Sequence, residues 1–510
     1  MSASAEARAM VDAHEAVAAL GDRRAKGVYY TPSEVVVAAI NAALDTALAA
    51  AGDVSALTTL DPAAGAGAFL LGVHAALAER SSSLGVKRPL AQALAGLHGV
   101  DLDGAALDVA WRALLVQAAP DEPTAREQEA LRARLVVGDA LHGDAPRAHL
   151  VVGNPPYGRA AADERDRLAA RFPELGGEVD RACAFSLRAL ELCRPGGALA
   201  LVVPDTWLTS KAGRGLRAAL ASRATVLGVH DLGKPFRTAK DTRVHVLAAR
   251  SSVGGGAARV TSLGVPLREV SQAVLRETAA RGWWLYRTDA EEALCARVAT
   301  LPTLGASREV IYGLRTGDNA RYVSRTAGVA QLVGGEDVEP YALRVKPKWL
   351  VEFAKEHATN ARRQRGPRVA VQRIRTNSAR PSARWLEAAP VLDGALCLDS
   401  LTAIAAHDVA DAHALTAWLC SAPVNRVYKL HFTDVNVRPA TLSTLPLPAL
   451  TPRLATLGAA LATATGARAT ALQREADAEV YRLLGCDAAE TETLERGWWG
   501  AGPRPELPSV

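Results

Sequence analysis

Residues 153–158, Gly-Asn-Pro-Pro-Tyr-Gly, follow a short apolar run and form an unusual loop. Two successive prolines fix two φ angles and remove two backbone donors, so the loop is rigid and presents acceptors. Two fixed acceptors suit an amino group whose lone pair is delocalised into a ring, such as that of adenine, which is a poor nucleophile. The Asn154 side-chain oxygen and the Pro155 carbonyl can accept both hydrogens of such a group. These contacts strengthen as positive charge develops on the nitrogen. The pattern predicts Asn154, Pro155, Pro156 and Tyr157 as catalytic, with the base stacked on Tyr157.

Three acids stand at the ends of strand-like runs that precede this loop. Asp61 opens the small-residue segment 62–67, Asp101 lies in GVDLD, and Asp139 lies in VVGDA. Small residues let the backbone approach a ligand closely, and a carboxylate at a strand tip can hold both ribose hydroxyls of a nucleoside. The alternative is that such acids only cap helices. Three acids at successive strand ends favour a site for a nucleoside cofactor. The sequence has no Walker loop, which argues against ATP as that cofactor.

The elements that must position these residues alternate regularly. Seven strand-like runs, separated by Ala/Leu-rich helical stretches, lie between about residues 30 and 250: TTLDP, LHGVDLD, ARLVVGDA, HLVVGNPPY, GALALVVPD, LGVHDLG and VHVLAARS. This alternation predicts parallel βαβ units and an α/β, Rossmann-like doubly wound sheet. The expected organisation is a cofactor-binding domain over 1–255, a linker over 256–290, a separate mixed α+β domain over 291–450, and a helical segment and tail over 451–510.

The order of these motifs resembles the gamma class of N6-adenine DNA methyltransferases, of the TaqI and Eco57I type. KGVYYTP at 26–32 comes first, followed by DPAAGAGAFL, GVDLD, GDA and NPPYG. FSLRALELCRPGGALALVVPDTWLTS at 185–210 and a loop with Lys234-Pro235-Phe236 continue the match over about residues 20–250. The resemblance implies a methyltransferase that uses S-adenosyl-L-methionine and acts on double-stranded DNA.

The resemblance also implies a role for each cofactor-site residue. In that family the segment matching 30–32 contacts the methionine end of the cofactor, and Asp61 with its small neighbours lines the same cleft. Asp101 would bind the ribose, and Asp139 the adenine amino group of the cofactor. The cofactor-binding residues implied are Tyr30, Thr31, Pro32, Asp61, Pro62, Ala63, Gly65, Asp101, Leu102, Asp139 and Ala140.

The target base would be held on both faces. By the same resemblance Phe236 closes the face opposite Tyr157, because such an enzyme must flip the adenine out of the duplex. Ala64 and Ala66 stand where many members of the class carry Cys and Ser. This departure removes side chains but leaves the backbone donors.

The C-terminal half shows a weaker resemblance and a run of arginines. Residues 313–323, GLRTGDNARYV, look like the opening of the TaqI-type specificity domain, and LPLP at 445–448 looks like its close. No acid lies between His357 and Leu386. Such a run either forms a solvated surface or contacts DNA phosphates. Phosphate contacts would make the affinity for DNA fall steeply as the salt concentration rises. The predicted DNA-binding residues are Arg362, Arg363, Arg365, Arg368, Arg373 and Arg375.

Composition excludes several classes of protein. The six cysteines lack CxxC spacing and the eleven histidines form no HxxxH pattern, so no metal site is expected. We expect no membrane span, because we find no apolar run of about 18 residues, and no signal peptide, so a cytoplasmic location is predicted. The net charge of +5 argues only weakly for a polyanionic partner.

Other functions share part of this pattern. A protein N5-glutamine methyltransferase meets the same chemical problem with the same NPPY loop, but usually lacks the YTP segment and the long C-terminal half. An adenine-RNA methyltransferase and a non-catalytic DNA-binding subunit of a defence complex are further alternatives. About 25 residues precede YTP, too few for a nuclease, so cleavage would belong to a separate nuclease or another subunit of a restriction-modification or phage-defence system.

Overall fold

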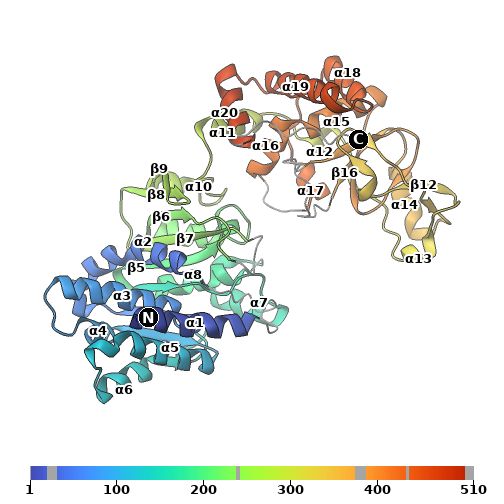
Figure 1. Ribbon diagram of the computed structural model, residues 1–510. Helices are drawn as coiled ribbons and strands as arrows, with labels where there is room; N and C mark the ends of the chain where they lie inside the picture. The colour runs from blue at the N-terminus through green and yellow to red at the C-terminus, as the bar shows by residue number, and fades with distance from the viewer. Residues whose placement is uncertain are drawn as a thin grey trace. The chain divides into compact units, whose positions relative to one another are not determined.

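The computed structural model describes residues 2–19, 31–177, 179–236, 242–373, 386–431 and 436–499. The chain divides into two compact units, Met1–Tyr286 and Arg287–Val510 (Figure 1). Each unit has its own secondary structure and its own core, and we describe them separately.

A nine-stranded sheet forms the centre of the first unit. Its strands are β1 (Thr59–Asp61), β2 (Leu97–Asp101), β3 (Leu135–Val137), β4 (Ala148–Gly153), β5 (Cys193–Pro204), β6 (Thr225–Asp231), β7 (Val244–Arg250), β8 (Ala257–Ser262) and β9 (Val265–Ser271). Their spatial order is β3-β2-β1-β4-β5-β7-β6-β8-β9. Strands β1 to β5 run parallel to their neighbours within this group. The predicted α/β class with a large central sheet is confirmed.

Helices cover both faces of this sheet (Figure 1). They are α1 (Ala3–Ala19), α2 (Ser33–Ala51), α3 (Ala68–Ser83), α4 (Pro89–Ala93), α5 (Gly104–Ala118), α6 (Ala125–Arg134), α7 (Ala162–Arg171), α8 (Arg181–Leu192), α9 (Arg214–Arg223) and α10 (Gln272–Thr278). The chain leaves β1 through α3 toward β2, and leaves β4 through α8 in the opposite direction toward β5. Right-handed crossovers therefore place α3 and α8 on opposite faces. The reversal of strand order between β1 and β4 is where an open α/β sheet forms its ligand crevice.

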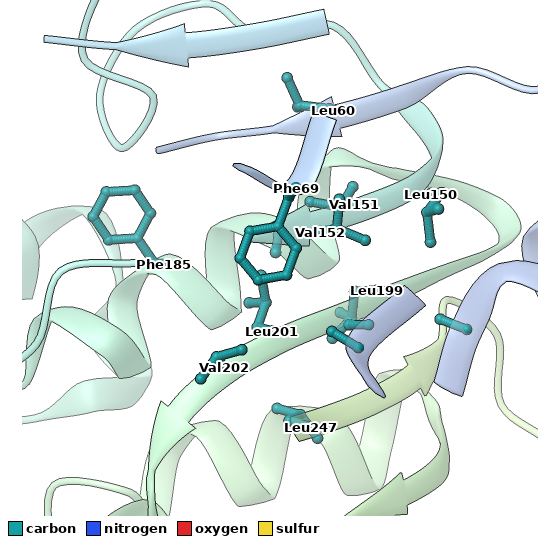
Figure 2. Close-up of a cluster of buried hydrophobic side chains, with 14 of the residues drawn as sticks. Leu60, Phe69, Leu150, Val151, Val152, Phe185, Leu199, Leu201, Val202 and Leu247 are labelled. Carbon is teal, nitrogen blue, oxygen red and sulfur yellow. The ribbon is translucent and has the colours of Figure 1, made fainter. Parts of the chain in front are cut away.

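The core of the first unit joins both layers of helices to the sheet. Figure 2 shows Phe69 of α3 and Phe185 of α8 with side chains from β1, β4, β5 and β7. Leu60, Val151 and Leu201 at the centre of these strands have no exposed surface. Burying one such side chain contributes about 1.5–3 kcal/mol, so the middle strands anchor the unit and hold its loops in place.

Helix α2 is a core helix, although by length and composition it is apolar enough to cross a bilayer. Glu34, Asn41 and Asp45 interrupt its apolar residues, so the expected lack of an uninterrupted apolar run still holds. The helix packs against β4, β5 and β7 and buries Val35, Val36, Ile40 and Leu44 there. The sheet therefore covers the apolar face of this helix.

Strand β7 departs from the predicted parallel arrangement. It lies antiparallel between β5 and β6, with Leu247 opposite both Leu201 and Val229. Twelve residues, 232–243, connect β6 to β7. About twelve residues is the lower limit for a parallel crossover, which usually contains a helix, whereas an antiparallel pair can be joined by a shorter connection.

The segment 256–290 is not the linker that its glycine-rich start suggested. Strand β8 pairs parallel to β6, and β9 pairs antiparallel to β8, so both extend the central sheet. Beyond α10, Trp283 is buried and its indole N–H donates to the carbonyl of Leu275 at 2.9 Å. The first unit accordingly ends near residue 286 rather than 255.

The second unit combines small sheets with helices. One sheet has the order β10-β19-β16-β17, another β11-β15-β12-β18, and a third pairs β13 with β14. The strands are β10 (Val310–Tyr312), β11 (Val323–Ser324), β12 (Ala330–Val333), β13 (Val338–Glu339), β14 (Ala342–Leu343), β15 (Trp349–Leu350), β16 (Arg368–Gln372), β17 (Ala388–Val391), β18 (Leu396–Cys397) and β19 (Leu401–Ala405). The helices are α11 (Asp289–Val298), α12 (Leu304–Ser307), α13 (Asn319–Tyr322), α14 (Lys355–Arg363), α15 (Val409–Cys420), α16 (Ala422–His431), α17 (Pro439–Leu442), α18 (Pro452–Leu461), α19 (Gly466–Leu483) and α20 (Ala488–Trp499).

The C-terminal helices belong to the second unit and do not form a segment apart. Helix α18 packs against α15 and α19. Leu454 and Val480 from these helices share one buried cluster with Trp418 of α15 and Val369 of β16. The expected boundary at residue 450 therefore falls inside a single core.

Candidate functional site

The loop after β1 is built from small residues that bring α3 close to α5. Gly67 precedes α3 with a φ of 89°, and a Cβ atom there would lie 2.7 Å from the Cβ of Ala110. Gly65 has a φ of 50°, and apart from its two chain neighbours no described residue has an atom within 4 Å of the position a Cβ would take. Pro62 is buried and Ala63 half-buried beside them. The loop thus leaves open space above Gly65.

Asp101 ties this loop to the tip of β2. Its carboxylate accepts the N–H of Gly65 at 2.8 Å and the N–H of Asp103 at 2.9 Å. A carboxylate has about four lone-pair positions, so positions remain for other donors. Leu102, the next residue, is 75% exposed, so an apolar surface lies beside the acid. An acid next to an apolar wall suits a ribose and its base.

Asp139 lies at the same edge of the sheet, one strand further along. The N–H of Gly138 donates to the carbonyl of Asp101 at 2.9 Å. The Asp139 carboxylate accepts the N–H of Leu141 and the ring Nδ1–H of His142, each at 2.9 Å. Ala140 is buried beside it. The structure therefore brings Asp101 and Asp139 to neighbouring strand tips.

An arginine holds the loop that follows Asp139. Arg188 of α8 donates to the carbonyl of Ala140 at 2.9 Å and to the carbonyl of Gly143 at 2.8 Å. We did not single out Arg188 from the sequence, because the two segments lie more than forty residues apart and no local pattern joins them.

Asp61 is buried between this loop and the end of β4. Its carboxylate accepts the N–H of Ala63 at 3.0 Å. A Cβ atom on Gly153 would lie 2.7 Å from Asp61 Oδ1, so glycine at that position makes room for the carboxyl. Burial, with a smaller contribution from the nearby charge of Asp101, raises the pKa of Asp61 to about 8. Asp61 therefore holds a proton at neutral pH in the free protein.

The Asn-Pro-Pro-Tyr loop begins where β4 ends. The Asn154 side chain donates from Nδ2 to Thr31 Oγ1 at 3.0 Å, and its Oδ1 accepts the hydroxyl of Tyr157. The Tyr157 hydroxyl also lies 3.4 Å from the carbonyl of Val202 on β5. Pro155 is buried and Pro156 half-buried. The amide of Asn154 is thus held from both ends.

The predicted segment 30–32 reaches this loop through Thr31. Thr31 is buried and Pro32 directly precedes α2, whereas Tyr30 lies outside the described residues. The Thr31 carbonyl accepts Arg8 Nη2 at 2.6 Å, and its N–H donates to Glu15 Oε2 at 3.2 Å. Both partners stand on α1, so the first helix of the chain contributes to the site.

Tyr157 and Phe236 lie next to each other, but they do not form an open slot for a base. Their ring centroids are 6.4 Å apart, their planes are tilted by 58°, and both side chains are buried. This is ordinary aromatic contact geometry. A base can enter between them only after the two rings become parallel.

A charge cluster fixes both ends of the loop that carries Phe236. Asp231, at the end of β6, is buried and accepts Arg243, which immediately precedes β7. It also accepts Ser262 Oγ at 2.7 Å and the N–H of Gly233 at 2.9 Å. Neither member of the pair was predicted, since an arginine before a strand carries no sequence signal.

The arginines of the second unit differ in their environments. Arg362 and Arg365 are exposed, Arg363 pairs with Glu309 at 2.8 Å, and the guanidinium of Arg373 lies 5.3 Å from the ring centre of Tyr312. Arg375 lies outside the described residues.

Arg368 is a correction to the predicted DNA-binding set. It is 2% exposed and donates to the carbonyls of Gly366 and Ala395. A buried guanidinium bonded to carbonyls cannot reach a phosphate, so Arg368 supports the sheet instead.

Fold and site together define an α/β protein with acids at adjacent strand tips and an amide-aromatic loop at the strand reversal. Residues 96–236 match the sequence model of a family described as Eco57I restriction-modification methylase. Type II methyltransferase M.XhoI of Xanthomonas vasicola is 28% identical over 221 residues, which cover 38% of this chain and 40% of the relative. The chain thus matches less than half the length of that curated relative. These matches support a methyltransferase of the restriction-modification kind.

Solved structures share the fold over most of the chain. The Type IIL restriction-modification enzyme MmeI, solved in complex with DNA, matches with a TM-score of 0.58 at 11% identity, over 91% of this chain and 76% of that chain. A nuclease-deletion mutant of the Type ISP enzyme LlaGI, solved with a DNA substrate mimic, matches with a TM-score of 0.56 at 12% identity, over 85% of this chain and 46% of that chain. At these identities the likeness concerns the fold.

Proposed function

We propose that this chain is a site-specific DNA methyltransferase that transfers a methyl group from S-adenosyl-L-methionine to the exocyclic N6 of a flipped-out adenine. The observation that carries the proposal is the Asn154 side-chain amide. It is held by Thr31 and Tyr157, and it lies one residue beyond the glycine that makes room for Asp61. The chain would serve a restriction-modification or phage-defence system, with cleavage by a separate nuclease or subunit.

The strand-tip residues fit a nucleoside cofactor. Asp101 has lone pairs left for ribose hydroxyls, the exposed Leu102 offers an apolar wall for the base, and the open space above Gly65 admits a ligand close to the backbone. When bound, S-adenosyl-L-methionine supplies a methyl group that is electrophilic because it is attached to a sulfonium. Thr31, Asp61 and the small residues that follow Asp61 would line its methionine end.

The catalytic loop would activate the amino group by accepting its hydrogens. Asn154 Oδ1 and the Pro155 carbonyl accept one hydrogen each, which favours a tetrahedral nitrogen whose lone pair is free to attack the methyl carbon. As the new nitrogen–carbon bond formed, the bond from the methyl carbon to sulfur would break and the sulfonium would become a neutral thioether. The amino nitrogen would then lose one hydrogen to solvent as a proton. Acceptors that are fixed before the reaction stabilise the developing charge without reorganisation, so no strong general base is required.

DNA is proposed as the partner on the basis of the second unit. Exposed Arg362 and Arg365 lie on and after α14, in a stretch free of acids. Tyr312 is 47% exposed and connects this stretch to Arg373, because its carbonyl accepts Asn360 of α14 and its ring contacts Arg373. The related enzymes MmeI and LlaGI were solved with DNA or a DNA mimic. A protein glutamine methyltransferase would not need such a surface.

The test is methyl transfer by the purified full chain. Duplex DNA of mixed sequence is incubated with S-adenosyl-L-methionine. One portion is digested to nucleosides for mass spectrometry, and another is read by single-molecule sequencing to locate the modified base. We expect N6-methyladenine at a defined sequence, and none with Asn154→Ala. Methylation of cytosine, of RNA alone or of a protein glutamine would overturn the proposal, as would full activity of the Asn154→Ala variant.

A further inference from the structure

The side-chain amide of Asn154 has two ends of similar shape and opposite hydrogen-bonding character. Rotation about its terminal torsion is broad and roughly two-fold, so an unrestrained amide samples both orientations. One orientation presents oxygen to an amino group, and the other presents two N–H donors. Only the first can accept a hydrogen from a substrate amine.

We propose that Thr31 is a positioning residue that fixes the Asn154 amide with its oxygen toward the substrate amino group, an inference that rests on the proposed function. Thr31 Oγ1 accepts Asn154 Nδ2 at 3.0 Å, and Thr31 is 4% exposed. At such a site a lost partner is not replaced freely by water, so the orientation that satisfies both groups is favoured.

Tyr157 supports the same orientation from the other end. Its hydroxyl donates to Asn154 Oδ1, while a second lone pair on that oxygen stays available. A tyrosine hydroxyl can also accept a hydrogen bond, so on its own it allows either orientation. The threonine contact is therefore the second restraint that the amide needs.

Helix α1 holds Thr31 itself through the backbone. Arg8 Nη2 donates to the Thr31 carbonyl, Glu15 accepts the Thr31 N–H, and Arg8 is oriented by Asp12 at 2.8 Å. These contacts fix the main chain of residue 31 from both sides, independently of its side chain. A change at the hydroxyl therefore tests orientation of Asn154 and leaves this backbone grip in place.

The experiment compares three variants of the full chain. Thr31→Val keeps the shape but removes the acceptor, and Thr31→Ser keeps the hydroxyl. Thr59→Val is the matched control, because Thr59 is fully buried in β1 and its hydroxyl has no hydrogen-bond partner among the described residues. Cofactor affinity is measured by calorimetry, and the rate of methyl transfer is measured in a single turnover with saturating duplex DNA.

We expect Thr31→Val to slow the single-turnover rate at saturating cofactor by about 100-fold, the scale of misplacing a catalytic group. Thr31→Ser should recover most of the rate, and Thr59→Val should match the parent. A Thr31→Val protein with the parental rate would overturn the proposal. So would a Thr31→Ser protein as slow as Thr31→Val, or a rate loss that vanishes at saturating cofactor.

A second readout does not depend on any activity. In protein labelled with ¹⁵N-asparagine, the side-chain amide pair of Asn154 is identified by its loss in Asn154→Ala. We expect slow hydrogen exchange at this pair in the parent and in Thr31→Ser, and exchange at least about ten-fold faster in Thr31→Val. If the parent fails to methylate adenine, the proposed function is wrong, whereas unchanged exchange in Thr31→Val refutes the role of Thr31 itself.

Discussion

Asp61 is a carboxyl group buried beside a second acid, and its proton affects the stability of the protein. Its pKa rises from the ordinary 3.8 to about 8 in the folded chain, chiefly through burial. Between these two pKa values the folded state binds a proton that the unfolded state has lost. The contribution of Asp61 to the free energy of unfolding therefore decreases as pH rises from about 4 to about 8.

Asp61→Asn should remove this part of the pH dependence, because the amide keeps the acceptor for Ala63 and cannot ionise. One group contributes at most about 1.4 kcal/mol per pH unit. Urea denaturation at pH 5.5 and 8 measures it, and we expect the variant to lose less stability than the parent over that range. Asp45→Asn, an exposed acid on α2, is the control and should follow the parent. Identical pH dependence in Asp61→Asn and the parent would mean that Asp61 is ionised in the fold.

Asp101→Ala should weaken cofactor binding and leave the fold intact. The lost hydrogen bonds to a charged group are worth roughly 1.5–3 kcal/mol. Isothermal calorimetry with S-adenosyl-L-methionine measures this loss. Asn154→Ala is the comparison, since its side chain is assigned to the target amine and should leave the affinity almost unchanged. Equal affinity of the parent and Asp101→Ala would remove this acid from the cofactor site.

The individual residues that the sequence could indicate are those within a local motif. Acids at strand ends and the Asn-Pro-Pro-Tyr loop are visible because each motif carries its own spacing. The contact between Thr31 and Asn154 joins positions 123 residues apart, and Arg8 reaches Thr31 from a different helix. Such contacts depend on how β4 and α1 meet in space, and no local pattern encodes that.

At the level of elements, the loop between β6 and β7 depends on the pair formed by Asp231 and Arg243. Arg243→Met leaves the buried Asp231 carboxylate without its arginine, while Ser262 and Gly233 still donate to it and His245 Nε2 lies 3.9 Å away. Removing a partner of a buried polar group costs about 1–3 kcal/mol, more when it is charged. We expect a lower midpoint of thermal unfolding and slower methyl transfer, since Phe236 is carried by this loop, with cofactor affinity unchanged.

The control for this prediction is the double variant Asp231→Asn with Arg243→Met. It removes the unpaired charge, so it should be more stable than Arg243→Met alone. Arg259→Met, at an exposed position on β8, should behave like the parent. If the single and double variants unfold at the same temperature, the pair does not hold the loop.

Strands that contain a run of apolar residues could be predicted from the sequence. The direction of a strand, and the existence of an exposed strand, depend on pairing with other strands and could not. All seven apolar runs correspond to strands. The antiparallel direction of β7 and the addition of β8 and β9 come from tertiary pairing. Strand β9 is largely exposed along its length, so its sequence lacks the apolar run that identifies a buried strand.

At the scale of the whole molecule, the chain separates cofactor residues from the proposed DNA surface. The strand-tip acids and the Asn-Pro-Pro-Tyr loop lie in Met1–Tyr286, and the arginine run lies in Arg287–Val510. The sequence indicated this division, but it placed the boundary at 255 because a glycine-rich segment resembled a linker. That position falls between β7 and β8, so a cut there would remove two strands from the central sheet.

The division predicts that charge in the second unit controls DNA affinity through phosphate contacts. Arg362→Ala together with Arg365→Ala should weaken binding to duplex DNA. Each phosphate contact contributes about 0.9 to the slope of log affinity against log salt, so the slope should fall by up to about two units. Fluorescence anisotropy from 50 to 200 mM salt measures both quantities.

Arg468→Ala together with Arg474→Ala removes the same charge from exposed positions on α19 and should change neither the affinity nor the slope. Equal effects of the two double variants would mean that net charge alone governs binding. An unchanged slope in the first would show that the arginine run is a solvated face, and the second unit would then have to recognise DNA through other residues.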